Sequence, residues 1–340
     1  MGLSDRVVVD CHNDWLLLLE RERSLDRKDS LERRFLPQFR EAGINVQVSP
    51  IYIDPEFVPE GALRRTVLTI QHLKEEIAHT HDRASLCLTG DDIDRAVSEN
   101  ELAVVIALEG SHAIANDVDL FEVFFDLGVR MASFTHFGNT SLAGGSADGD
   151  PGLGLSRLGV EALRTLERLG IVMDVSHLST QSTEDVLDLA TRPLVASHSS
   201  SKAMRDHHRN LSIEHIKGIA ALGGVIGIPA AIPSFIDPDH PTIERVVDHI
   251  EHIASSVGVD HVGIGADYVR EYFDEAYPTY EDIRVAGEDV RATIEGLESP
   301  AGMPSLIEAL AARGLSSEEL RKILGGNFLR VFREVMGLGS

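Results

Sequence analysis

Eight short apolar segments, separated mostly by segments of helical pattern, constrain the fold of this chain of 340 residues more than any other feature. They cover residues 7–9, 44–53, 102–108, 129–135, 171–176, 193–197, 225–228 and 261–266. The segment 102–108 is apolar throughout, as expected for a strand that is buried on both faces. Strands that alternate with helices predict a parallel sheet of the α/β class, which eight strands can close into a (β/α)8 TIM barrel. An open, doubly wound sheet is the alternative.

Helical patterns lie between these segments and at the end of the chain. We expect helices at residues 61–82, 120–127, 156–169, 180–190, 212–222 and 243–257, followed by two C-terminal helices. Ser156 and Ser212 are suited to cap two of these helices, and the last helix begins with the capping box Ser316-Ser317-Glu318-Glu319. The charged stretch 20–34 predicts a solvated loop or a short helix, and 268–304 a loop-rich stretch. We therefore predict a single barrel domain over residues 1–340.

Polar side chains that can bind metal or transfer protons come at the carboxyl ends of most of the predicted strands. They are His12, Asp14, Glu109, His136, His177, His198 and Asp267. In a closed barrel these ends form one rim around one cavity, whereas strands far apart in an open sheet could not bring them together. This placement favours the barrel.

Five of these side chains are suited to bind one or two zinc-like ions: His12, Asp14, Glu109, His177 and His198. His12 and Asp14 are two residues apart in an extended segment, so they point to the same side. A single histidine at a strand end is more often structural than a ligand, but seven polar residues at strand-end positions, five of them with ligand chemistry, are hard to explain by chance. Two such ions would lie about 3.5–4 Å apart and would need a bridging group, which the carboxylate of Glu109 and a hydroxide can supply. His12 and Asp14 would bind one ion, and His177 and His198 the other.

The two remaining side chains have the chemistry that hydrolysis requires. Asp267 can take a proton from an attacking water and return it to a leaving amine. His136 can stabilise the oxyanion of a tetrahedral intermediate. The hydroxide between the metals would be the nucleophile, because metal binding lowers the pKa of water from about 15.7 towards 7.

The other histidines and two aspartates near the strands receive more ordinary interpretations. We expect solvated side chains for the histidines in predicted helices, which are His72, His79, His81, His215, His249 and His252. For Asp10 and Asp174, a hydrogen-bonded structural role is at least as favoured as the orientation of a metal ligand.

The formal net charge of −24 argues against binding to nucleic acid or to an anionic membrane surface. The first residues lack a signal-peptide pattern, and no apolar run approaches the length of a membrane span. We therefore expect a cytoplasmic protein without a nucleic-acid or membrane partner.

Five short motifs resemble, in this order, those of a known family: Asp10-Cys11-His12-Asn13-Asp14, Leu108-Glu109-Gly110, Thr135-His136, Asp174-Val175-Ser176-His177 and Ser197-His198-Ser199-Ser200. The family is that of the renal (membrane) dipeptidases, the M19 metallopeptidases of the amidohydrolase superfamily. The tail at 322–332 also resembles the C-terminal helix of this family.

The resemblance implies a (β/α)8 barrel with two zinc ions, bridged by Glu109 and bound by His12, Asp14, His177 and His198. It implies that His136 contacts the scissile carbonyl and that Asp267 is the catalytic aspartate. It adds Arg209, in the pair Arg209-Asn210, as the residue that holds the C-terminal carboxylate of the dipeptide. Asn210 is placed with it at the substrate. A homodimer and the cleavage of both L-Xaa-L-Xaa and L-Xaa-D-Xaa dipeptides are further implications.

The chain departs from the family pattern in two rim loops, at 141–145 and 268–270, and rim loops usually shape the substrate pocket. We expect a zinc-dependent dipeptidase with its own side-chain preference. Two alternatives are a related hydrolase of N-acyl amino acids and a barrel that binds a metal or ligand without catalysis.

Overall fold

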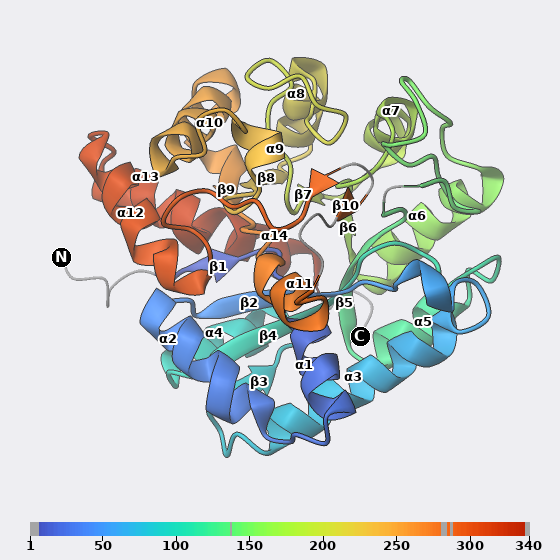
Figure 1. Cartoon of the computed structure of the whole chain (residues 1–340). Helices are drawn as coiled ribbons and strands as arrows, with labels where there is room; N and C mark the ends of the chain where they lie inside the picture. Colours follow the sequence, from blue (N-terminus) through green and yellow to red (C-terminus); the bar gives the residue numbers. More distant parts are fainter. Residues whose placement is uncertain (1–6, 137, 280–283, 286–287, 337–340) are drawn as a thin grey trace.

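The computed structural model describes residues 7–136, 138–279, 284–285 and 288–336. At its centre eight parallel strands follow one another around a ring, surrounded by helices (Figure 1). In ring order the strands are β1 (Val9–Asp10), β2 (Val46–Ile51), β4 (Leu102–Leu108), β5 (Val129–Ser133), β6 (Val172–Asp174), β7 (Val195–Ala196), β8 (Val225–Ile228) and β9 (Val262–Ile264). A short strand that the sequence did not predict, β3 (Ala84–Leu86), pairs with β4 outside this ring.

Backbone hydrogen bonds join the first and last strands of the ring. The N–H of Cys11 donates to the carbonyl of Ile264 at 3.0 Å, and the N–H of Asp267 donates to the carbonyl of His12 at 2.9 Å. These bonds bring the end of β1 beside the end of β9, although about 250 residues separate them in the chain. The (β/α)8 barrel is confirmed, and the open sheet is excluded.

Helices follow most of the strands and form the outer layer. They are α1 (Trp15–Ser24), α2 (Leu36–Ala42), α3 (Ala62–Ala78), α4 (Gly90–Ser98), α5 (Leu120–Asp126), α6 (Arg157–Leu169), α7 (Thr180–Leu189), α8 (Ile213–Ala221), α9 (Pro233–Ile236), α10 (Ile243–Val257), α11 (Arg270–Ala276), α12 (Met303–Ala312), α13 (Ser317–Arg321) and α14 (Asn327–Val335). No helix in the described ranges is long and apolar enough to cross a membrane.

The predicted caps begin three of these helices. Ser156 and Ser212 accept hydrogen bonds from Gly159 N and His215 N, each at 3.1 Å. Ser316 and Glu319 form the predicted capping box, because each side chain bonds to the backbone N–H of the other residue. Local hydrogen bonds therefore determine where α6, α8 and α13 start.

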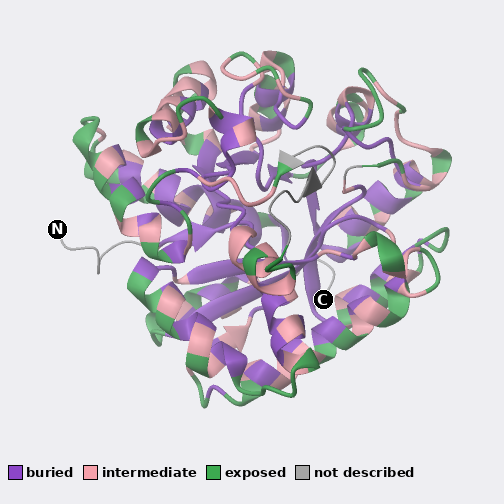
Figure 2. Ribbon diagram, viewed as in Figure 1, coloured by how far each residue is buried: buried purple, intermediate pink, exposed green. Residues whose placement is uncertain are grey.

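Two apolar layers hold the barrel together, and Figure 2 shows that the eight strands of the ring are buried while the outer faces of the helices are exposed. The outer layer lies between strands and helices. In the inner one, side chains from the strands pack with Phe328, Val331 and Phe332 of α14. Asn327, at the start of this helix, donates to the carbonyls of Val259 and Val262 at 2.7 and 2.8 Å. Helix α14 therefore covers the amino-terminal end of the barrel and leaves the carboxyl end for the site.

The expectation of a solvated loop or short helix at 20–34 was wrong in part. α1 continues to Ser24, a π-helical turn covers Leu31–Phe35, and two charged side chains are buried. Glu20 lies 2.6 Å from His72 Nδ1 and 3.2 Å from Arg65, and Glu22 lies 2.9 Å from Arg27. Acidic residues look solvated in a sequence, but these two are buried with cationic or imidazole partners, which for Glu20 come from α3.

The loop-rich stretch 268–304 contains the helix α11, which lies in front of the barrel centre in Figure 1. Arg34 forms ion pairs with this helix. Its Nη2 atom lies 2.6 Å from the carboxylate of Glu271 and 2.5 Å from that of Glu275. Residues 280–283 and 286–287 of the stretch lie outside the described residues. Ion pairs thus fix α11 against the segment that follows α1.

The expectation of solvated helical histidines was wrong for His215 and His249, which are buried. His249, on α10, is fully buried beside the hydroxyl of Ser200, and its Nε2 lies 3.2 Å from the carbonyl of Ile236. Burial, with the nearby charge of Arg245, lowers the pKa of His249 from 6.5 to about 4.

This lowered pKa predicts a pH-dependent stability. Between about pH 4 and 6.5 the unfolded chain takes up a proton at His249 that the folded protein excludes, so this stabilisation is lost as the pH falls through that range. Denaturant titration gives the free energy of unfolding of wild type and of His249→Gln. The value for wild type minus the value for the variant should be lower by roughly 2 kcal/mol at pH 5 than at pH 7.5. His240, whose side chain is 76% exposed, provides the control variant His240→Gln, for which we expect no such change. A difference between wild type and His249→Gln that stays constant with pH would contradict this assignment.

Candidate active site

All seven side chains predicted for the rim lie together at the carboxyl end of the barrel. His12 and Asp14 follow β1, Glu109 follows β4, His136 follows β5, His177 follows β6, His198 follows β7 and Asp267 follows β9. His177 and Asp267 have φ angles of 69° and 64°, the left-handed region that side chains rarely adopt. The backbone thus turns sharply where β6 and β9 end, and strain of this kind clusters at functional sites.

His12 is the centre of a first group of possible metal ligands. Its Nε2 lies 3.4 Å from Glu109 Oε1 and 4.0 Å from the nearest oxygens of both Asp14 and Asp267. His12 Nε2 and Asp14 Oδ1 are buried and have no hydrogen-bond partner among the described residues. Burial lowers the pKa of His12, but the carboxylates raise it to about 10. This excess of buried negative charge fits a cation between these atoms.

His177 and His198 form a second group on the other side of Glu109. Their Nε2 atoms are 2.9 Å apart and lie 3.0 and 3.6 Å from Glu109 Oε1. Burial lowers the pKa of both imidazoles well below 6.5, with a further contribution from the charge of Arg209. Both rings are therefore neutral near pH 7, which is the form that binds a metal.

One oxygen of Glu109 faces both groups. Burial raises the pKa of Glu109, but His12 and His136 lower it well below its usual range, so the side chain is a carboxylate. Imidazole nitrogens and carboxylate oxygens in this number fit divalent metals such as zinc. The described residues thus bring together every side chain that the sequence predicted as a ligand, with Glu109 between the two groups.

His136 lies at the edge of this cluster, with Nε2 3.8 Å from Glu109 Oε1. Burial lowers its pKa from 6.5 to about 4, so it is neutral near pH 7 and can donate a hydrogen bond. Its ring packs against Tyr52, at 4.6 Å between ring centroids. The sequence did not predict a role for Tyr52, which directly follows β2. Its position at a strand end could have indicated a site residue, but its apolar neighbours predicted that it belongs to the strand itself.

Arg209 lies in the loop between β7 and α8 and is 3% exposed. Its NH2 donates to the carbonyl of His198 at 3.1 Å, and its guanidinium lies over the ring of Phe235 at 5.3 Å. Its charge lowers the pKa of His136, His177, His198 and Asp267. A buried cation therefore lies beside the predicted metal ligands.

The side-chain amide of Asn210, in the same loop, forms hydrogen bonds with backbone groups. Its Oδ1 accepts from Ser200 N at 3.2 Å, and its Nδ2 donates to the carbonyls of Arg205 and Phe235 at 3.0 and 2.8 Å. Both donor hydrogens thus have backbone partners, so Asn210 stabilises the loop that carries Arg209. Its predicted contact with the substrate stays a prediction.

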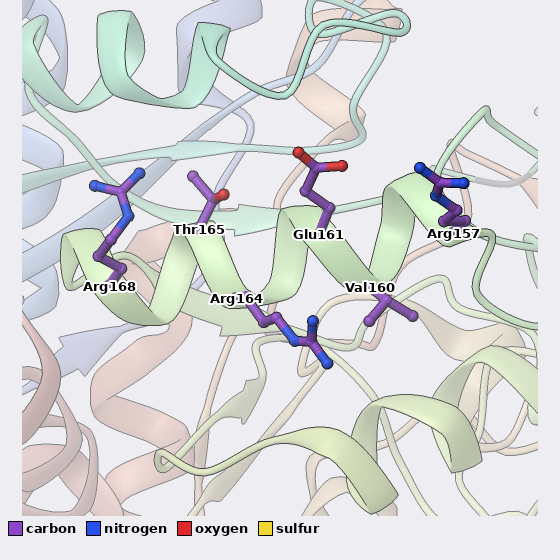
Figure 3. Close-up of a pocket in the computed structure, with 6 residues that line it drawn as sticks. All are labelled: Arg157, Val160, Glu161, Arg164, Thr165 and Arg168. Carbon is purple, nitrogen blue, oxygen red and sulfur yellow. The ribbon is translucent and has the colours of Figure 1, made fainter.

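A groove also lies on the outer surface of α6, lined by Arg157, Val160, Glu161, Arg164, Thr165 and Arg168 (Figure 3). Its residues all come from one helix, and Figure 3 shows their side chains pointing away from it in different directions. It contains none of the seven rim residues and is therefore separate from the candidate active site.

Residues 3–284 and 286–339 match the model of the membrane dipeptidase family, peptidase family M19. The chain belongs to this family. Among curated relatives, the dipeptidase verJ of Clonostachys rogersoniana is 30% identical over 352 residues, which cover 98% of this chain and 85% of that protein. The dipeptidase tcpJ of Claviceps purpurea is 28% identical over 344 residues, covering 96% and 76%.

Solved structures show the same fold. The metallopeptidase dipeptidase AC of family M19 has a TM-score of 0.84 at 25% identity and covers 98% of this chain and 99% of its own. A metallopeptidase from Rhodobacter sphaeroides, liganded with a phosphinate mimic of L-Ala-D-Ala, has a TM-score of 0.84 at 24% identity, with coverage of 97% and 99%. The family match and the curated relatives identify this chain as a dipeptide hydrolase of the metallopeptidase type.

The buried carboxylates predict that this dipeptidase depends on metal for its stability. Removal of divalent ions with a chelator should lower the thermal midpoint, and Zn²⁺ should restore it, because a bound ion compensates the charges of Asp14, Glu109 and Asp267. At a free Zn²⁺ concentration 100-fold above Kd the gain is about 2.7 kcal/mol per ion. Glu109→Gln, which removes the shared carboxylate, should show a smaller response. Equal midpoints of wild type with and without metal, measured by calorimetry, would exclude this metal site.

Proposed function

We propose that this dipeptidase binds two Zn²⁺ and cleaves L-Xaa-L-Xaa and L-Xaa-D-Xaa dipeptides. The observation that carries the proposal is the position of Glu109, one oxygen of which lies 3.4 Å from His12 Nε2 and 3.0 Å from His177 Nε2. His12 and Asp14 would hold one ion, His177 and His198 the other, and Glu109 both. The ligand of the Rhodobacter sphaeroides structure, a mimic of L-Ala-D-Ala, supports a D-residue at the C-terminal position.

The bound ions would lower the pKa of water towards neutrality and polarise the scissile carbonyl. Asp267 would take the proton of the attacking water and deliver it to the leaving amine. Burial and the nearby Glu109 raise its pKa from 3.8 to about 6, which suits a group that both accepts and donates near neutral pH. The neutral His136 would donate a hydrogen bond to the oxyanion.

Arg209 would bind the C-terminal carboxylate of the substrate. A guanidinium reads a carboxylate through two parallel hydrogen bonds, and a buried one does so away from competing water. This contact would restrict the substrate to a peptide whose carboxylate lies close to the scissile bond, that is, a dipeptide.

Hydrolysis of N-acyl amino acids is the second candidate, because those molecules present the same carboxylate to Arg209. A requirement for a free substrate amine separates the two candidates. A non-catalytic barrel is disfavoured by the relationship to dipeptidases and by the presence of both Asp267 and His136 at the metal ligands. The cytoplasmic location and the homodimer stay predictions.

The role of Asp267 can be tested with a library of dipeptides and N-acetyl amino acids and the zinc-loaded protein. We expect hydrolysis of dipeptides, and a decrease of kcat of about 10²–10⁴-fold in Asp267→Asn, which keeps the shape of the side chain but cannot accept the proton. The zinc content of the variant, determined by atomic spectroscopy, should stay at the wild-type value. Undiminished hydrolysis in Asp267→Asn would disprove its role, and cleavage of N-acetyl amino acids alone would favour the second candidate.

If Arg209 binds the C-terminal carboxylate, its replacement should reduce the preference of the enzyme for a dipeptide over the dipeptide amide. Wild type should cleave a dipeptide with a higher kcat/KM than the corresponding dipeptide amide, and Arg209→Met should reduce this ratio by about 10–100-fold, the value of a charge-assisted hydrogen bond. Arg205→Met is the matched control, because Arg205 lies in the same loop but its Nε lies 3.3 Å from the carbonyl of Ser234. If both variants kept the wild-type ratio, Arg209 would not be the carboxylate-binding residue.

A further inference from the structure

One buried hydroxyl lies behind the metal ligands, between the imidazoles of His12 and His198. Ser197 Oγ is 2.7 Å from Nδ1 of His198 and 3.4 Å from Nδ1 of His12. These are the ring nitrogens opposite the Nε2 atoms that lie near Glu109. The two histidines come from β1 and β7 and belong to different ligand groups, so this hydroxyl contacts one ligand of each proposed metal ion.

Asp174, at the end of β6, is the third partner of this hydroxyl. Its Oδ2 is 2.5 Å from Ser197 Oγ, and its Oδ1 accepts the backbone N–H groups of Ser176 and Ser197, each at 2.9 Å. Asp174, His12 and His198 place possible ligand atoms within 4.8 Å of one another, which by itself would suggest another metal site. The Ser197 hydroxyl lies within hydrogen-bond distance of all three side chains, however, so the arrangement is a hydrogen-bond network.

The hydrogens in this network can be assigned from the chemistry of the groups. Both oxygens of Asp174 act as acceptors, so the single hydrogen of the Ser197 hydroxyl points to Oδ2. The serine oxygen then has lone pairs for two donors. One is the Nδ1–H group of His198 at 2.7 Å, and the other place is shared by the Nδ1–H group of His12 at 3.4 Å and the hydroxyl of Ser176 at 3.3 Å. A hydrogen on Nδ1 leaves the lone pair on Nε2, the nitrogen that faces the other predicted ligands.

The backbone holds Ser197 in this position. A Cβ atom at Gly227 or Gly265 would lie only 2.1 or 1.8 Å from the carbonyl oxygen of Ser197. Glycines on β8 and just after β9 therefore allow the backbone to approach Ser197 closely. Ser197 and Asp174 are buried, at 0% and 4% exposure, so water does not compete for their hydrogen bonds.

We propose that Ser197, held by Asp174, is a positioning residue that fixes the tautomer and orientation of one histidine in each metal group and thereby supports the binding of both metal ions. This inference rests on the proposed binding of two Zn²⁺. It assigns Asp174 to the orientation of ligands, the alternative that the sequence analysis left open.

The test is Zn²⁺ binding to the chelator-treated full chain, measured by competition with a chromophoric chelator. Ser197→Ala should lower the affinity for both Zn²⁺ ions by about 10–100-fold, the usual effect of removing a hydrogen-bond partner of a ligating histidine. Ser199→Ala is the matched control, because Ser199 is equally buried and flanks His198 on the other side, but its hydroxyl has no hydrogen-bond partner among the described residues. The control should bind Zn²⁺ as wild type does. The thermal midpoint of each metal-free variant separates a loss of affinity from a loss of folding.

Asp174→Asn is the second variant, for the case that Ser197→Ala does not fold. With an amide nitrogen in place of Oδ2, the serine hydroxyl loses its carboxylate acceptor and accepts a hydrogen bond there instead. Its own hydrogen then turns towards an imidazole or the Ser176 hydroxyl and no longer favours the Nδ1–H tautomers, so we expect weaker binding of zinc again. The inference would be overturned if the variants bound Zn²⁺ with wild-type affinity, or if the affinity for only one of the two ions decreased. If wild type itself bound fewer than two Zn²⁺, the proposed function would fail instead.

Discussion

Three carboxylates, of Asp14, Glu109 and Asp267, are buried around a single imidazole nitrogen of His12 at 3.4–4.0 Å. An unpaired buried charge costs about 3–5 kcal/mol, while a whole domain is stable by only about 5–15 kcal/mol. Such a cluster is tolerated only where positive charge or bound protons compensate it. In the metal-free protein, burial raises the pKa of Asp14 and Asp267, and a protonated His12 and the charge of Arg209 offset part of the negative charge that remains. Bound cations would replace these protons, including the one on Nε2 of His12.

The closed barrel makes this concentration of charge possible. The backbone bonds between Cys11 and Ile264 and between Asp267 and His12 bring the two ends of the strand ring together. They place Asp267 beside His12, so the catalytic candidate and the first ligand meet only when the barrel is complete. At the opposite end, the apolar side chains of α14 fill the barrel. Apolar packing thus closes the amino-terminal end of the barrel, and the charged groups that chemistry requires are at the other end.

Behind the ligands, hydrogen bonds from residues at the ends of β6 and β7 restrict how the imidazoles can turn. Ser197 and Asp174 contact the sides of His12 and His198 that face away from Glu109. Asn210 uses its amide to fix the loop of Arg209, and Ser200, which donates to Asn210, is itself contacted by the buried His249. The site thus depends on two sets of buried polar groups that hold its ligands and the loop of Arg209, and partly satisfied networks of this kind are costly.

The sequence by itself determined the eight strands, three helix caps and the seven rim residues, because apolar periodicity and strand-end position are local properties of the chain. It predicted Arg209 only through the family resemblance, and it did not predict the ring contact of Tyr52 with His136 or the burial of Glu20 and His249. Those features depend on partners such as Arg65 or Ser200, which are distant in the chain. Only the tertiary structure decided which polar groups are buried together, since burial and pairing depend on how segments meet in space and local patterns carry no record of that.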